Sequence, residues 1–159
     1  MAVTAYFYAR AFLSILNKET DFNSNNISVA LTSSAYTPNQ DTHDYFNDIT
    51  NQLSTANGYT AEDGAGAGYS LTTVAVSQST NVISLTADNP VWTSSGAGFT
   101  ARDLIVTDVT PGTSATDPLY CWMDFGQDET ASGGGTFTVD WSGSGVIATI
   151  TATDATGFP

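Results

Sequence analysis

The feature that most constrains the fold of this chain is a series of short strand-like segments in its second half. The segments are rich in β-branched and aromatic residues, which favour extended backbone, and clusters of Gly, Pro, Asn, Asp and Ser separate them. Short strands at such regular intervals are typical of antiparallel sheets. We therefore predict a mainly β fold, either an antiparallel β-sandwich or a jelly-roll or barrel. The predicted strands are residues 71–76, 82–86, 99–107, 119–125, 137–141 and 146–151.

The last two predicted strands have the clearest inward faces. Phe137, Val139 and Trp141 alternate with polar residues, so one face of their strand is apolar. Residues 146–151 alternate in the same way. A short Ser-Gly-Ser-Gly segment joins the two strands, and it predicts that they form a hairpin.

Residues 4–18 have the pattern of an amphipathic helix. Apolar side chains recur at three- and four-residue spacing, Thr4 is placed to cap the first turn, and Lys18 falls where a cation complements the helix dipole. Two interpretations remain open: a helix that packs across the sheet, and a helix that also docks on another subunit.

One further strand and a long loop lie between this helix and the later strands. Apolar and polar residues alternate over residues 27–32, which predicts the first strand. Residues 33–70 are expected to form a long loop region, and within it residues 57–69, rich in Gly and Ala, are expected to be a flexible connection. Neither a repeat nor a convincing linker divides the chain, so we predict a single domain over residues 1–159.

The charge balance excludes some classes of partner. Sixteen acids stand against three Lys and Arg residues, giving a net charge of −13. Nucleic acids and anionic membranes are bound largely through Lys and Arg, so neither is expected as a partner. The lone cysteine, Cys121, is expected to be an inert core thiol. Without a signal-peptide pattern or an apolar run of spanning length, the protein is expected to be made in a cytoplasm and to stay soluble.

Acidic residues cluster in the loop after residue 32, but their spacing does not match a metal site. Asp41, Asp44 and Asp48 are separated by three and four residues, and Asn39 and Asn47 add further oxygen atoms. An established calcium loop has acids at alternate positions, a Gly and a terminal Glu, which this segment lacks. We therefore interpret the segment as a solvated loop, and we predict no metal ligands and no cofactor.

Two groups of side chains have chemistry that suits catalysis, and neither forms a recognisable motif. His43 stands beside acids, but no nucleophile or pocket is evident around it in the sequence. Asp124, Asp128 and Glu129 could supply the acidic pair of a glycosidase, yet such proximity is expected by chance among sixteen acids. We predict no catalytic residues. The tryptophans fall in strand patterns and are expected in the core: Trp92, Trp122 and Trp141.

Several pieces of the chain together resemble a known family. The early pieces are the predicted helix leading through Asn17-Lys-Glu19, the strand over residues 27–32, and the loop that follows, most specifically residues 36–45. The chain is similar through these pieces to a family of small virion structural proteins of tailed bacteriophages. Residues 110–117 make a longer loop than this family leads us to expect. Later landmarks agree in order over nearly the whole chain: Gly58-Tyr-Thr60, Ala87-Asp88, Val91-Trp92, Phe99-Thr-Ala-Arg102, Asp124-Phe-Gly126, Phe137-Thr-Val-Asp-Trp141 and Gly145-Val-Ile147.

The resemblance implies a non-enzymatic role in the virion. Its most specific form is a capsid decoration or cement protein that lies on the outer surface of the head, binds the major capsid protein and bridges its subunits. Because capsids are symmetric, a homo-oligomer is expected, and its specific form is a trimer. The long loop exceeds what a simple connection needs, so it is expected to be a contact arm. The expected contact residues are Tyr36, Pro38, Asn39, Tyr45 and Phe46.

Two alternatives remain open. The first is a tail or neck component, such as a tube, adaptor or fibre-base protein, which differs from a decoration protein in its place on the particle. The second is a carbohydrate-binding β-sandwich module or a glycosidase. That alternative predicts exposed tryptophans whose fluorescence is quenched saturably by sugar.

Overall fold

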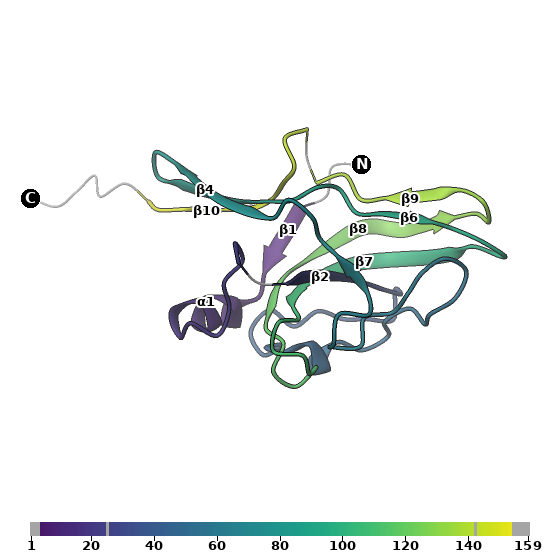
Figure 1. The fold of residues 1–159 in the computed structure, drawn as a ribbon, viewed down its shortest axis with the longest axis horizontal. Coiled ribbons are helices and arrows are strands. Elements are labelled where there is room, and N and C mark those ends of the chain that lie inside the picture. The colour runs from purple at the N-terminus through teal and green to yellow at the C-terminus, as the bar shows by residue number, and fades with distance from the viewer. Residues whose placement is uncertain (1–3, 25, 142, 154–159) are drawn as a thin grey trace, which may run out of the picture.

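The structure is mainly β and its sheets are antiparallel, as the strand pattern predicts. The computed structural model describes residues 4–24, 26–141 and 143–153 (Figure 1). Its architecture is β-sandwich-like, with one short helix near the N-terminus. The elements in chain order are β1 (Thr4–Phe7), α1 (Ala9–Leu16), β2 (Ile27–Thr32), the 3-10 helix η1 (Phe46–Asp48), β3 (Tyr69–Ser70), β4 (Ala75–Ser79), β5 (Val82–Thr86), β6 (Val91–Thr93), β7 (Phe99–Asp108), β8 (Leu119–Ala131), β9 (Thr136–Thr138) and β10 (Val146–Thr151).

Two layers of strands face each other. The larger layer is a five-stranded sheet in the order β1-β8-β7-β2-β3, with the long strands β7 and β8 near its centre. The second layer consists of two smaller sheets, β10-β5-β4 and β6-β9, and it lies above the first in Figure 1. The sheet β10-β5-β4, hereafter the small sheet, extends beyond the larger sheet toward the left of that view.

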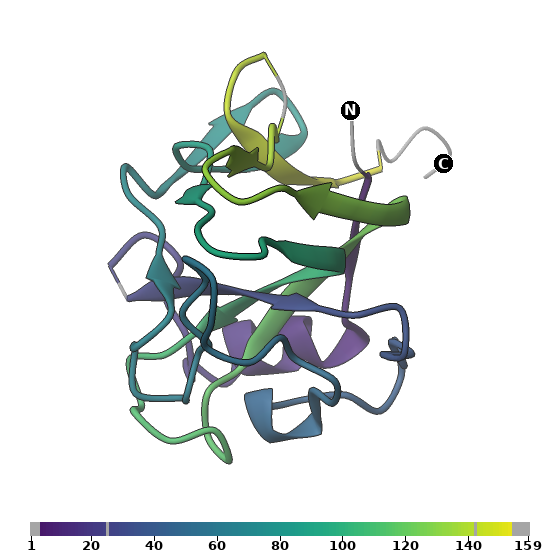
Figure 2. The same ribbon diagram turned by 90° about the vertical axis from the view of Figure 1, so that its right-hand side faces the viewer.

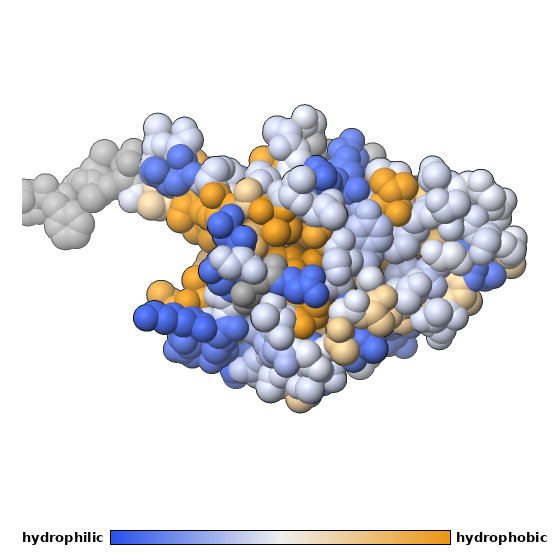
Figure 3. All heavy atoms as spheres, in the orientation of Figure 1, coloured by the Kyte–Doolittle hydropathy of each residue, from blue (hydrophilic) through white to orange (hydrophobic). Residues whose placement is uncertain are grey.

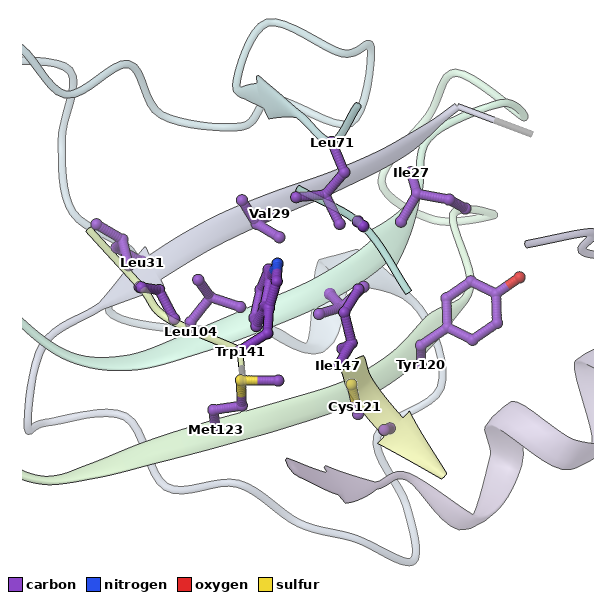
Figure 4. Close-up of a cluster of buried hydrophobic side chains, with 14 of the residues drawn as sticks. Ile27, Val29, Leu31, Leu71, Leu104, Tyr120, Cys121, Met123, Trp141 and Ile147 are labelled. Atoms are coloured by element: carbon purple, nitrogen blue, oxygen red, sulfur yellow. The ribbon is translucent and has the colours of Figure 1, made fainter. Parts of the chain in front are cut away.

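The main hydrophobic core fills the space between these layers. Leu104 and Met123 point into it from the large sheet, and Trp141 and Ile147 from the opposite layer (Figure 4). Phe137, Val139 and Trp141 are buried while Thr138 and Asp140 are exposed, which confirms the predicted inward face of residues 137–141. Trp92 and Trp141 are core residues as predicted, whereas Trp122 is only partly buried.

A third layer covers the other face of the large sheet. Helix α1 and the segment around η1 lie on this side, below the sheet in Figure 2. A second buried cluster lies on this face of the sheet. It consists of Tyr8, which precedes α1, of Tyr36 and Phe46 from the long loop, and of the sheet residues Ala30, Ile105 and Leu119. All six residues of β2 are therefore buried. The alternation over residues 27–32 correctly placed one face in the main core, but the opposite face is not exposed.

The N-terminal helix is shorter than predicted, because residues 4–7 form a strand. Strand β1 is an edge strand of the large sheet and pairs antiparallel with β8, with Thr4 opposite Asp124 and Phe7 opposite Cys121. Backbone groups that a helix would pair internally are paired here with a distant strand, so the prediction of a helix over residues 4–18 is wrong at both ends. Thr4 caps no helix, and Lys18 lies beyond the end of α1 with a left-handed φ of 62°.

The predicted hairpin between the last two strands is also wrong. β9 pairs with β6, and β10 pairs with β5, so the two neighbours in sequence belong to different sheets. The bounds of β5 and β10 are as predicted, whereas β4 starts four residues later than expected and β9 ends at Thr138. Strand β8 continues to Ala131, because its polar end still pairs with Phe99 and the residues that follow it. Strands β3 and β6 were not predicted.

The Gly-rich segment expected to be a flexible connection is held by one buried carboxylate. The Oε1 atom of Glu62 accepts hydrogen bonds from the backbone N–H groups of Asp63, Gly64 and Gly66 at 2.9–3.0 Å. Its Oε2 atom accepts another from Gly68 at 3.2 Å. The segment is therefore folded around Glu62 and does not form a free linker.

Candidate protein-binding surfaces

An apolar groove lies between α1 and the small sheet. It has a volume of about 600 Å³ and opens to the surface where Figure 3 shows hydrophobic residues gathered in a hollow. Thr20 and Tyr120 are its buried polar residues, and Lys18 and Asp21 are exposed at its edge. The apolar residues of the groove are Ile15, Phe22, Val76, Ile83, Leu85 and Ile150.

Several large apolar side chains in and beside the apolar groove are exposed. Val76 on β4 is 43% exposed, and Ile15 and Ile83 are each more than one-third exposed. Leu16, at the end of α1, is 78% exposed. Single exposed apolar residues are common, but a hollowed surface on which several converge is typical of a protein-binding site.

The small sheet carries no charge, although the chain is strongly acidic. Residues 72–87 and 141–153, which include all three of its strands, contain no Asp, Glu, Lys or Arg. The net charge of −13 therefore lies entirely outside these two segments. A partner can approach the small sheet without desolvating an ionised group of that sheet, which would be costly.

The floor of the apolar groove is fixed by a buried hydrogen-bonded chain. The Thr20 hydroxyl donates to Asp108 Oδ2 at 2.6 Å, so its single proton is used there. The Tyr120 hydroxyl, 2.5 Å from Thr20 Oγ1, must then be the donor in that contact. Burial is the main cause that raises the pKa of Tyr120. The Tyr120 ring also packs edge-on against Phe22, with ring centroids 5.2 Å apart, so the floor is rigidly built.

The structure corrects the expectation of an exposed contact arm in the loop. Tyr36 and Phe46 are buried in the second cluster, where they cover the face of the large sheet that α1 leaves open. The expectation that Tyr36 and Phe46 are exposed contact residues is therefore wrong. Pro38 and Tyr45 are half-buried and Asn39 is exposed, and for these three residues a contact role stays a prediction.

His43 serves the packing of this loop. Its Nδ1 atom lies 2.9 Å from the Tyr36 hydroxyl, which in turn lies 2.8 Å from the buried Tyr8 hydroxyl. The hydrogen-bonded chain Tyr8–Tyr36–His43 thus ties the loop to the residue that precedes α1. The sequence alone does not indicate this role for His43, because the hydrogen bonds connect it through Tyr36 to Tyr8, which lies 35 positions away.

The loop acids have separate structural roles. Asp44 forms an ion pair with Arg10 at 3.0 Å, and Asp48 Oδ2 accepts hydrogen bonds from the backbone N–H groups of Asp44 and Tyr45. Among the described residues, no group of three or more His, Cys, Asp or Glu side chains is arranged to hold a metal ion.

The acids on β8 are also engaged in structural contacts. Asp124 forms a two-point ion pair with Arg102, which lowers the pKa of Asp124, and Glu129 accepts a hydrogen bond from the Gln127 side chain. Cys121 is fully buried, and burial raises the pKa of its thiol to about 12. The burial of Cys121 agrees with its interpretation as a core residue.

A smaller, polar cavity lies beside the loop. This loop pocket has a volume of about 290 Å³ and is formed by residues 34 and 36–38 together with Arg102 and Asp103 of β7 and Trp122 and Asp124 of β8. It was not anticipated from the sequence, because its residues come from three separate segments.

Comparison with known proteins adds no relative. No protein-family model, no curated protein and no solved structure matches the chain. In the part of the chain that the structure describes, no helix is long and apolar enough to cross a membrane.

Proposed function

We propose that this protein is a non-enzymatic structural protein of a tailed-bacteriophage virion, most specifically a capsid decoration protein. In this proposal it binds the major capsid protein on the outer surface of the head and bridges neighbouring capsid subunits. The observation that carries the proposal is the apolar groove between α1 and the small sheet. A segment of the major capsid protein is its occupant.

The apolar groove supports a structural role through its chemistry. Most of its lining is aliphatic or aromatic, the strands on one side carry no charge, and Lys18 and Asp21 lie only at the edge, so contact with a partner depends chiefly on apolar burial. Burial of apolar surface contributes roughly 25 cal/mol per Å², which suits a lasting attachment. The helix interpretation in which α1 also docks on another subunit agrees with the exposure of Ile15 and Leu16.

The distribution of charge supports the same role. A net charge of −13 opposes contact with packaged DNA and discourages random self-association. The uncharged small sheet is an exception within this acidic surface, and a specific protein contact can form there without like-charge repulsion. Together with the family resemblance of residues 36–45, this pattern favours a protein that attaches to the outside of a particle.

The proposal is tested with two valines of equal exposure. Val76 lies in the apolar groove and Val91 lies outside it on β6, and each is 43% exposed. Purified wild-type protein is expected to co-sediment with heads assembled without it. V76S is expected to lose most of this binding, more so when combined with I83S, while V91S binds like wild type. If V76S/I83S is folded and still binds as well as wild type, the proposed role of the apolar groove is refuted.

Particle imaging tests the location separately. Density for this protein over the head is expected if it is a decoration protein. Density confined to the tail or neck would replace the proposal with the alternative of a tube, adaptor or fibre-base protein. In that case the apolar groove would remain a candidate contact with a different subunit.

A further inference from the structure

We propose that the loop pocket binds the ammonium group of a lysine side chain from a partner protein. The site is distinct from the apolar groove and does not depend on the proposed function. Three features carry the inference: a buried carboxylate with a free oxygen, a rim whose charges cancel, and an aromatic wall.

The buried carboxylate belongs to Asp103. This residue is only 3% exposed, yet it lines the loop pocket. The Thr32 hydroxyl donates to Asp103 Oδ2 at 3.2 Å, and within the described residues no donor reaches Oδ1. Ionised carboxylates that are buried normally collect several donors or a cation. The unpartnered oxygen at this cavity therefore has the chemistry of a cation-binding group.

The charges at the rim of the loop pocket neutralise each other. Arg102 Nε and Nη2 contact Asp124 Oδ1 and Oδ2 at 2.6 and 3.2 Å, a two-point pairing that uses both oxygens of Asp124. Asp103 is left as the uncompensated charge of the cavity. The loop pocket is therefore suited to a single positive charge and not to a divalent ion, which requires more oxygen ligands.

The aromatic wall favours an organic cation. Trp122 lines the loop pocket, and its ring is backed by Tyr6 and Tyr8, with ring centroids 5.3 and 4.9 Å away. A cation beside an indole is attracted by the ring quadrupole, and the alkyl chain that carries it can pack on the same surface. Ser34 and Thr37, both exposed, also line the loop pocket, and their hydroxyl oxygens can accept hydrogen bonds from an ammonium group.

The geometry of the carboxylate distinguishes lysine from arginine. A guanidinium group pairs best with both oxygens of a carboxylate in a planar fork. At Asp103 the Oδ2 atom already accepts from Thr32, so a guanidinium fork would have to share that oxygen, whereas no donor among the described residues reaches Oδ1; Asp124 is occupied by Arg102. A single free oxygen is matched by an ammonium group, which needs only one contact in a given direction.

Binding is expected to depend on pH. Burial, and next the charge of Asp124, raise the pKa of Asp103 to about 6, while Thr32 and Arg102 act in the opposite direction and Asp128 raises it slightly. Tyr36 and Tyr8 also lie close to Asp103, and both have a raised pKa, chiefly through burial, so they stay neutral; His43 contacts Tyr36 but does not line the pocket. Ammonium binding should therefore weaken about tenfold for each pH unit below 6, as Asp103 becomes protonated.

The test uses Nα-acetyl-lysine amide as the probe, titrated into the full chain and followed by amide chemical shifts and by calorimetry. Saturable binding with shifts at residues 34–37 and 102–103 is expected at pH 7.5, and at least tenfold weaker binding at pH 5. The uncharged analogue Nα-acetyl-norleucine amide should not bind. Nα-acetyl-arginine amide should bind more weakly than the lysine probe.

Two variants of equal net charge separate the loop pocket from general attraction to an acidic protein. D103N is expected to weaken lysine-probe binding at least tenfold and to abolish its pH dependence. D41N, which changes an exposed acid outside the pocket, should bind within twofold of wild type. Equal binding by folded D103N and D41N would overturn the proposal, as would the lack of saturable binding by the wild-type protein.

Discussion

The Ser28 hydroxyl donates a hydrogen bond to Glu62 Oε2 at 2.5 Å and thereby joins strand β2 to the Gly-rich loop. Both residues are buried, and the remaining acceptor positions of Glu62 are taken by backbone N–H groups of the loop. One side chain thus organises residues 62–68 and anchors them to the large sheet. The arrangement also explains Gly68, because a Cβ atom there would lie 2.7 Å from Glu62 Oε2.

Replacement of Glu62 by Ala should destabilise the protein strongly. The change removes the acceptor of four loop N–H groups, whereas the buried Ser28 hydroxyl keeps the Tyr69 carbonyl oxygen at 3.0 Å; each buried group left unsatisfied costs about 1–3 kcal/mol. We expect a loss of at least about 3 kcal/mol in the free energy of unfolding, measured by urea denaturation. D63A is the control, because Asp63 accepts two backbone hydrogen bonds in the same loop but is exposed. Equal losses for E62A and D63A would contradict this role for Glu62.

A charge on the inward face of residues 137–141 should be far more damaging than one on the outward face. Val139 is buried in the main core and Thr138 is exposed. V139D loses about 1.5–3 kcal/mol of apolar burial and also buries a charge, so a total above about 3 kcal/mol is expected. T138D should change the free energy of unfolding by less than about 1 kcal/mol. A thermal melt of the two variants tests this, and similar melting temperatures would refute the assigned face.

The sequence predicts those parts of the fold that depend on the local alternation of apolar and polar residues. The pattern of Phe137, Val139 and Trp141 reports burial directly, and the bounds of β5 and β10 follow from short apolar runs between turn residues. The pairing of strands cannot be predicted from this local pattern. The Ser-Gly-Ser-Gly turn allows a hairpin, but the choice of β5 as the partner of β10 depends on packing between distant segments.

The candidate sites were harder to predict, because each is assembled from distant segments. In sequence, Tyr36 and Phe46 look like exposed loop aromatics. They are buried because they pack on the face of the large sheet that lies opposite the main core. The apolar groove had one signal: the amphipathic pattern of residues 4–18, to which Ile15 belongs, left docking on another subunit open. Nothing near Asp103 in sequence indicates that it lines the loop pocket together with Trp122 and residues 34 and 36–38.

Asp103 should make the protein less stable as the pH rises from about 4 to above 6. Its pKa is raised from its ordinary value of 3.8 to about 6, mainly by burial, so the folded state binds this proton more tightly than the unfolded chain. The stability that protonated Asp103 contributes is complete below about pH 4 and is lost as the pH passes 6. A shift of about two pKa units corresponds to at most about 3 kcal/mol.

The D103N variant isolates this contribution, because other acids also affect the pH dependence. At pH 8, without lysine-like ligands, D103N is expected to unfold at a higher urea concentration than wild type, and at pH 4 the two should coincide. D41N should follow the wild-type curve throughout, since Asp41 is exposed. A D103N variant that is no more stable than wild type at pH 8 would show that the buried carboxylate is compensated in solution.

The Tyr8–Tyr36 pair should show strong energetic coupling. The two hydroxyls are 2.8 Å apart, and Tyr8 is fully buried, so Y36F leaves the Tyr8 hydroxyl without a partner. We expect Y36F to cost about 1–3 kcal/mol, whereas the double variant Y8F/Y36F should cost less than the sum of the two single changes, because both partners are removed together. Y45F is the control: its hydroxyl contacts Glu19 at 3.4 Å on the surface, and its effect should be within about 0.5 kcal/mol. Strictly additive effects of Y8F and Y36F in urea denaturation would show that the two hydroxyls do not depend on each other.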